Sequence, residues 1–91
     1  MDVTILLGSS SDLPIAQKCT KILEHFDVPY QLRVASAHRS PKFVEQIVGD
    51  ALDDGCSVFI AMAGLAAALP GAVAALTTKP VIGVPCGGRV P

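Results

Sequence analysis

Aromatic side chains are scarce in this chain of 91 residues: Phe, Tyr and Trp together make up 4%, and Trp is absent. So few rings argue against the stacked aromatic platform on which single-stranded nucleic acids bind. Charged residues are also few, at 16%, and the net charge of −1 comes without a cluster of Lys and Arg. We therefore expect no nucleic-acid and no anionic membrane partner. The 51% of hydrophobic residues excludes intrinsic disorder and predicts a single domain over residues 1–91.

Residues 55–78 carry no charged side chain at all. This length reaches the roughly 20 residues that a membrane-spanning helix needs. However, Gly64, Pro70 and Gly71 interrupt the stretch, and the apolar residues between them are mostly Ala. A strand, a small-residue loop and a short helix explain the stretch better than one continuous helix. The start of the chain also lacks the basic segment and cleavage site of a signal peptide, so we expect a cytoplasmic protein.

The three cysteines are odd in number and widely spaced, and they form no CxxC pair. With only two His to assist them, neither a disulfide framework nor a metal site is indicated, and a reducing compartment fits. Cys19 falls on the apolar side of a helix and is expected to be a small core residue. Cys86 lies in a glycine-rich loop and could be exposed.

Short apolar runs alternate with amphipathic stretches along the chain, with a period near 25 residues. A proline suited to a first helical turn opens each amphipathic stretch, at positions 14, 41 and 70. The predicted strands cover residues 3–7, 30–34, 57–62 and 81–84. This order indicates an α/β fold with a parallel sheet and right-handed crossovers. Because the chain stops soon after the last strand, we expect a domain that is incomplete at its C-terminus or covered by another subunit.

Four loops follow the predicted strands, and parallel strands present such loops at one edge of the sheet, where ligands bind. The loops read GSSSD, ASAHRS, AGLAAALPG and PCGGRVP. The serines of GSSSD precede a helix, whose N-terminal N–H groups suit an anion such as phosphate. The same serines could simply cap the helix, and Asp12 could cap it or bind a ribose hydroxyl. The pattern is neither GxGxxG nor GxxxxGK[ST], so dinucleotide or nucleoside-triphosphate binding is unsupported.

His38 and Arg39 are the chemically most telling pair, because they lie together in the second loop. An imidazole carries protons near neutral pH, and a guanidinium suits bidentate contact with phosphate. The alternative is an ordinary pair of surface residues, as we expect for the solvated His25. Since the third loop offers only backbone groups, the residues predict a site for a phosphorylated small molecule with one His.

Three motifs in order, GSSSD, VPYQLRVASAHRSP and AGLAAALPGAVAALTTKPVIGVP, resemble the phosphoribosylaminoimidazole carboxylase and N5-carboxyaminoimidazole ribonucleotide mutase family of purine biosynthesis. The resemblance runs from about residue 4 to residue 85. It implies a flavodoxin-like three-layer sandwich that assembles into an octamer. It also implies an isomerase that moves a carboxylate from N5 to C4 of aminoimidazole ribonucleotide, without metal or organic cofactor.

The resemblance further implies the site residues. The catalytic residue would be His38, as the proton shuttle. The residues that hold or wall in the ribonucleotide would be Ser9, Ser11, Asp12, Ser36, Arg39 and Gly64.

Two departures from the family pattern leave alternatives open. Ala68 stands where the family's third loop usually has His, and the motifs of the family's second half are missing. Direct carboxylation of aminoimidazole ribonucleotide by carbon dioxide is one alternative, although SAHRSP and ALPG resemble the mutase branch more closely. A degenerate nucleotide-binding module without catalysis is another. A carboxylase of another cofactor pathway is a third, and SAHRSP speaks against it.

Overall fold

The computed structural model describes residues 1–37, 40–64 and 68–86. Four strands alternate with three α-helices, and a 3₁₀ turn, η1 (Ser10–Asp12), precedes the first helix. The bounds are β1 (Val3–Leu7), α1 (Leu13–His25), β2 (Tyr30–Val34), α2 (Pro41–Asp53), β3 (Val58–Ala63), α3 (Leu69–Ala74) and β4 (Val81–Pro85). The strands begin and end within one residue of their predicted bounds, and each α-helix begins within one residue of its predicted proline.

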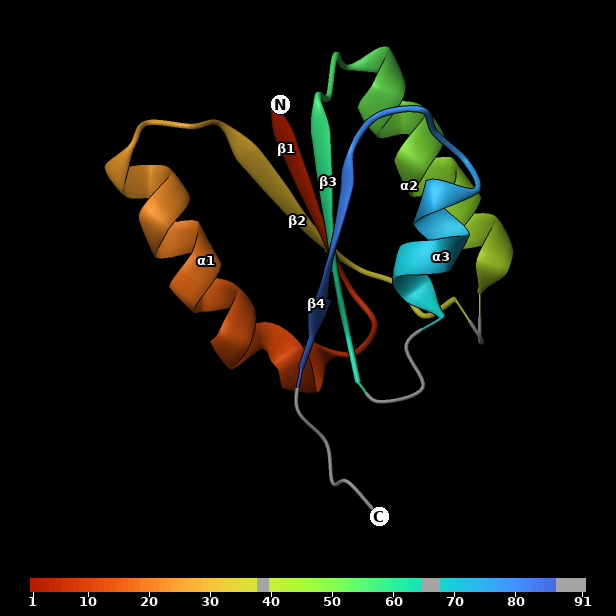
Figure 1. Cartoon of the computed structure of the whole chain (residues 1–91), viewed down its shortest axis with the longest axis horizontal. Helices are drawn as coiled ribbons and strands as arrows, with labels where there is room; N and C mark the ends of the chain where they lie inside the picture. The colour runs from red at the N-terminus through yellow and green to blue at the C-terminus, as the bar shows by residue number, and fades with distance from the viewer. Residues whose placement is uncertain (38–39, 65–67, 87–91) are drawn as a thin grey trace.

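The four strands form one parallel sheet in the order β2-β1-β3-β4 (Figure 1). β1 is central and pairs on both sides, with Val3 opposite Tyr30 of β2 and Val58 of β3. All five residues of β1 are buried, as expected for a strand covered on both faces. The predicted α/β class with a parallel sheet is confirmed.

Helices cover both faces of the sheet, which gives three layers (Figure 1). α2 and α3 lie on one face, and their buried side chains pack with Leu6, Phe59 and Ala61. α1 lies on the other face, where Ala16 packs in a cluster with Ile5 and Met62. Within the described ranges, no helix combines the length and apolarity needed to cross a membrane.

One part of the sheet is poorly covered, on the α1 face of β4. Ile82 of β4 is 51% exposed, whereas Ile5 of β1 is fully buried. The hydroxyl of Tyr30 donates a 2.7 Å hydrogen bond to Glu24 Oε1, which ties α1 to β2, the opposite edge strand. The expectation of a domain incomplete at its C-terminus stays a prediction.

Three local expectations need correction. Cys86 is buried, because its N–H donates to Ala63 O at 2.8 Å and the residue packs in the α1-side cluster. Ser40, directly before Pro41, and Asp12 are both residue types that favour a helix N-cap. They occupy the N-cap positions of α2 and α1, but neither side chain makes a capping hydrogen bond. Cys19 is half-buried against the α1-side cluster, and its predicted place in the core is thus confirmed only in part.

Candidate functional site

A cavity opens where β1 and β2 end. Its volume is about 580 Å³. The residues that line it come from the two strand ends, the loops behind them and the start of α2: Gly8, Ser9, Ser10, Val34, Ala35, Ser36, Ser40 and Phe43. Four serines therefore face a partly apolar wall, which suits a small ligand with both hydrogen-bonding and carbon-rich parts.

The first loop is shaped by its own serines. Ser9 caps the 3₁₀ turn, because its Oγ accepts a 3.2 Å hydrogen bond from the N–H of Ser11. The hydroxyls of Ser9 and Ser11 lie 2.9 Å apart, so each can donate to the other. Ser9 thus caps the 3₁₀ turn that precedes α1, whereas the N-cap of α1 itself is Asp12. Capping and ligand binding are compatible, since the Ser9 side chain also lines the cavity.

Asp12 is placed away from this cavity. It is 9% exposed and does not line the cavity, although it follows the serines directly. Its carboxylate lies near Cys86: burial raises the pKa of the Cys86 thiol, and the negative charge of Asp12 raises it further. Asp12 therefore lies on the β4 side of the first loop, within reach of the end of β4.

The second loop is bonded to the sheet where it begins and closes on itself where it ends. The N–H of Ala35 donates to Leu7 O at 2.8 Å, and the N–H of Ser40 donates to Ser36 O at 2.9 Å. These bonds hold Ser36 and Ser40 at the cavity wall. His38 and Arg39, the predicted proton shuttle and phosphate ligand, lie outside the described residues.

The third loop contributes less to the described cavity than expected. Gly64 is exposed and does not line it, and a Cβ placed on Gly64 would meet nothing within 4 Å. Ala68 is exposed at the N-cap of α3. Of the six predicted binding residues, the described structure thus brings Ser9 and Ser36 together in the cavity. Ser11, Asp12 and Gly64 lie outside its lining.

Six of the eight lining residues have no predicted binding role, and three of these carry polar or aromatic side chains: Ser10, Ser40 and Phe43. Ser10 stands within the GSSSD motif, and Ser40, directly before Pro41, is expected only to cap a helix. The helical spacing of Phe43 with Val44 and Ile47 predicts a core-facing side chain, yet Phe43 is 38% exposed and lies at the cavity wall. The missed signal is its position in the first turn of α2, where a side chain lies beside the preceding loop.

The described lining can bind a ligand, but it cannot carry out acid–base chemistry. Its polar groups are serine hydroxyls and backbone groups, and no carboxylate, imidazole or amine belongs to it. Among the described residues, no three His, Cys, Asp or Glu side chains gather as a metal site requires. Proton transfer in this cavity would need a group from outside the described lining, such as His38.

Fold and cavity together define a parallel α/β domain with a cavity at the carboxyl ends of its strands, the edge at which such sheets bind small molecules. The sequence matches the AIR carboxylase family over residues 2–90, and the chain belongs to that family. It is 56% identical over 88 residues to the N5-carboxyaminoimidazole ribonucleotide mutase of Methanocaldococcus jannaschii, covering 97% of this chain and 54% of that protein. A probable N5-carboxyaminoimidazole ribonucleotide mutase of Methanobrevibacter smithii is also 56% identical over 88 residues, covering 97% of this chain and 26% of that one.

A comparison with solved structures supports the same family and fold. The crystal structure of Treponema denticola PurE superimposes with a TM-score of 0.84 at 35% identity, covering 91% of this chain and 53% of that one. The expected family membership and flavodoxin-like fold are confirmed. The chain spans about half the length of the Methanocaldococcus jannaschii and Treponema denticola proteins.

Proposed function

We propose that this chain binds an aminoimidazole ribonucleotide and serves its carboxyl transfer in purine biosynthesis. The reaction converts N5-carboxyaminoimidazole ribonucleotide into 4-carboxyaminoimidazole ribonucleotide. The observation that carries the proposal is the cavity with four serines at the ends of β1 and β2, in a chain of the AIR carboxylase family. Serine hydroxyls and loop N–H groups suit the phosphate and ribose of such a ligand.

The proposed reaction consumes no net proton, because one proton is added to the substrate and one is removed. The bond between N5 and the carboxyl carbon breaks as N5 gains a proton, and carbon dioxide is held in the closed site. C4 then attacks that carbon, and the proton on C4 leaves as the new bond forms. His38 gives the first proton and takes back the second, a role that suits an imidazole near neutral pH. No metal or organic cofactor is part of this scheme.

Binding and turnover test the proposal separately. Calorimetry should show that the chain binds 4-carboxyaminoimidazole ribonucleotide, and absorbance should follow its formation from the N5-carboxylated substrate. His38→Asn should lose turnover by at least about a hundredfold, the typical contribution of a general acid or base. His25→Asn is the matched control, because His25 is exposed in the last turn of α1, at the other end of that helix from the serine loop, and does not line the cavity. Turnover that is independent of His38, or no binding, would overturn the proposal.

Two further candidates rest on specific observations. A relative from Candida glabrata, 48% identical over 86 residues, is named phosphoribosylaminoimidazole carboxylase, which favours direct carboxylation by carbon dioxide. Turnover of aminoimidazole ribonucleotide with bicarbonate, but not of the N5-carboxylated substrate, would select it. Ala68, exposed where a His is expected, favours a binding module without catalysis. If this candidate is correct, the unaltered chain should bind the ribonucleotide without turnover, and the Ala68→His variant should gain turnover.

Assembly and location belong to the same proposal. We infer that the chain forms a homo-oligomer, an octamer as the family resemblance implies, and works in the cytoplasm. Analytical ultracentrifugation of the 91-residue chain measures the assembly directly.

A further inference from the structure

Arg33 carries a positive charge without a counter-ion among the described residues. It lies on β2, the edge strand of the sheet, and its side chain is half-buried. The single ion pair in the described part of the chain joins the N-terminal ammonium to Asp54, so no carboxylate there lies within 4.0 Å of the Arg33 guanidinium. A half-buried cation without a partner is costly unless something else stabilises it.

The contact that holds Arg33 is the ring of Phe43. The guanidinium carbon lies 5.8 Å from the ring centroid, a cation–π arrangement. Phe43 also lines the cavity, together with the four serines. The ring thus both contacts the guanidinium and lines the cavity, which places the Arg33 charge beside the cavity wall. Salt screens a charge so close to a bound ligand only in part, because the Debye length is roughly 8–10 Å at ordinary salt.

The described lining itself is uncharged, because its polar side chains are serines. Hydroxyl groups donate hydrogen bonds to a phosphate but do not neutralise its charge. A nearby cation that keeps its full charge improves the binding of an anion and leaves a neutral ligand unaffected.

We propose that Arg33 is a specificity-determining residue that favours phosphorylated ligands over their unphosphorylated counterparts, with Phe43 as the positioning residue for its guanidinium. This inference rests on the proposed function, since it concerns the same cavity. Arg33 acts through space and does not need to touch the ligand. Its effect is therefore on affinity for the anion and on the salt dependence of that affinity.

The test compares two probes that differ only by the phosphate: aminoimidazole ribonucleotide and the corresponding ribonucleoside. Calorimetry or NMR titration of the 91-residue chain gives the ratio of their dissociation constants. Arg33→Gln should lower the preference for the nucleotide about three- to tenfold without changing nucleoside affinity, and should flatten its salt dependence. Arg33→Lys should keep most of the preference, and Phe43→Leu should lose part of it. Lys18→Gln, which removes the same charge from an exposed position on α1, should leave the ratio unchanged.

The outcomes separate the inference from the function on which it rests. If the unaltered chain binds neither probe, the proposed function fails, and this inference falls with it. If it binds the nucleotide but Arg33→Gln leaves the ratio unchanged or weakens both probes equally, Arg33 only packs against Phe43 and the inference alone is overturned. Thermal unfolding shows whether each variant is folded. If Arg33→Gln does not fold, Arg33→Lys and Phe43→Leu still test the inference.

Discussion

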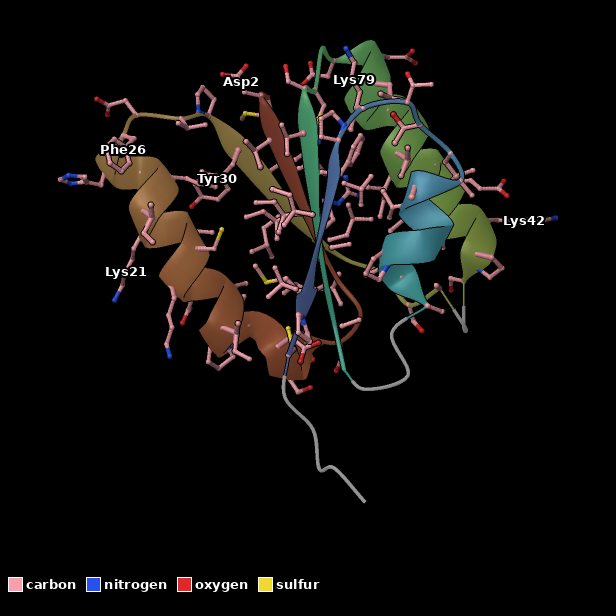
Figure 2. The ribbon with its side chains drawn as sticks, viewed as in Figure 1. Asp2, Lys21, Phe26, Tyr30, Lys42 and Lys79 are labelled. Carbon is pink, nitrogen blue, oxygen red and sulfur yellow. The ribbon has the colours of Figure 1, made fainter. Side chains whose placement is uncertain are left out.

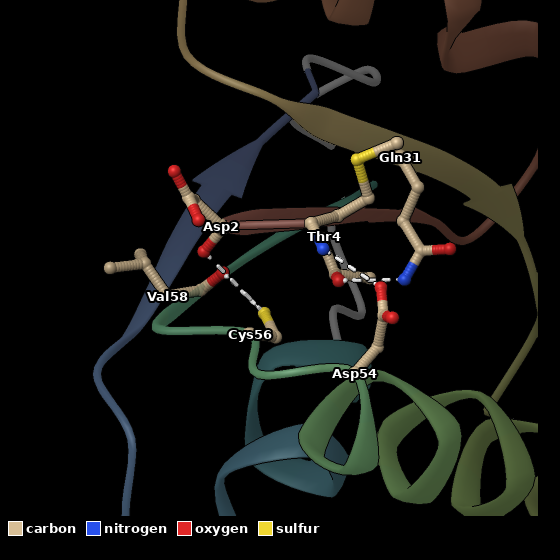
Figure 3. Close-up of polar contacts among 7 residues, drawn as sticks. Asp2, Thr4, Gln31, Asp54, Cys56 and Val58 are labelled. Carbon is tan, nitrogen blue, oxygen red and sulfur yellow. Dashed lines mark hydrogen bonds and ion pairs between the residues drawn. The ribbon is translucent and has the colours of Figure 1, made fainter.

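Gln31 Nε2 donates a 3.0 Å hydrogen bond to Thr4 Oγ1 across the pairing of β1 and β2 (Figure 3). Thr4 is fully buried in the central strand, whereas Gln31 on the edge strand is half-buried. A polar pair thus lies within an otherwise apolar layer, and each partner satisfies the other.

This pair should show strong energetic coupling. Gln31→Met should lower the free energy of unfolding by about 1–3 kcal/mol, because it leaves the buried Thr4 hydroxyl without that donor. Thr4→Val should cost less, about 0.5–1.5 kcal/mol, because the Gln31 amide can turn to water. The double variant should recover most of the loss. Urea unfolding of the four proteins measures the coupling, and strictly additive losses would contradict it.

The N-terminal ammonium donates a 2.8 Å hydrogen bond to Asp54 Oδ2 (Figure 3). This bond to Asp54 raises the pKa of the ammonium above its usual 8.0. Because the folded-state pKa is raised, the stabilising contribution is present below pH 8 and is lost as the pH rises through the folded value.

Asp54→Asn should therefore remove a stability loss that the unaltered chain shows above pH 8. Thermal unfolding midpoints between pH 6 and 10 measure it, with Met1 retained and no N-terminal tag. Asp50→Asn, at an exposed position on α2, is the control and should keep the loss. Identical pH profiles for Asp54→Asn and the unaltered chain would rule the contribution out.

Two exposed glycines around the end of α2 should respond in opposite ways to alanine. Gly49 lies inside α2, and a Cβ there would meet nothing within 4 Å. Gly49→Ala should raise the free energy of unfolding by about 0.5–1 kcal/mol, because alanine loses less conformational freedom in a helix. Gly55 has φ +84°, which alanine adopts only with strain, so Gly55→Ala should lower it by about 1 kcal/mol. Equal effects in urea unfolding would refute the conformational argument.

The Cys86 thiol should react slowly with iodoacetamide. Burial raises its pKa first, and the charge of Asp12 raises it further. Since the thiolate is the nucleophile, the alkylation rate at pH 8 should be low and should climb above pH 9. Asp12→Asn should speed alkylation of Cys86 but not of Cys19, whose pKa is raised by burial alone. Mass spectrometry resolves the individual cysteines. If Asp12→Asn speeds alkylation of Cys19 and Cys86 equally, the charge of Asp12 does not act on Cys86 specifically.

The regular elements were predictable because their signals are local. The apolar run of residues 3–7 becomes β1, and Pro41 opens α2. The direction of individual side chains was not predictable. Asp12 and Ser9 are three residues apart in one loop, yet only Ser9 reaches the cavity, because the 3₁₀ turn between them sets their directions. The burial of Cys86 likewise depends on a long-range bond to Ala63.

The exposure of side chains on the protein surface was the hardest property to predict from the sequence. Figure 2 shows Lys21 projecting from α1 and Phe26 at the C-terminal end of that helix. The helical spacing of Ile15, Cys19, Ile22 and Phe26 predicts an apolar stripe, yet Phe26 is 69% exposed. The ring contact with His25, at 5.0 Å between centroids, is a neighbour effect that the period does not predict. Periodicity predicts which face of a helix is buried on average, but it does not predict the burial of residues at the helix end.

The central place of β1 also bears on the order in which the protein folds. Val3 pairs with Tyr30 and with Val58, so the sheet forms from contacts between distant parts of the chain. Such non-local pairing slows folding, because a long loop must close before the contacts stabilise it. During synthesis, the serine cavity between β1 and β2 can form only once β2 has left the ribosome. A ligand could therefore bind there only after the start of α2 has also left the ribosome, because Ser40 and Phe43 complete the lining.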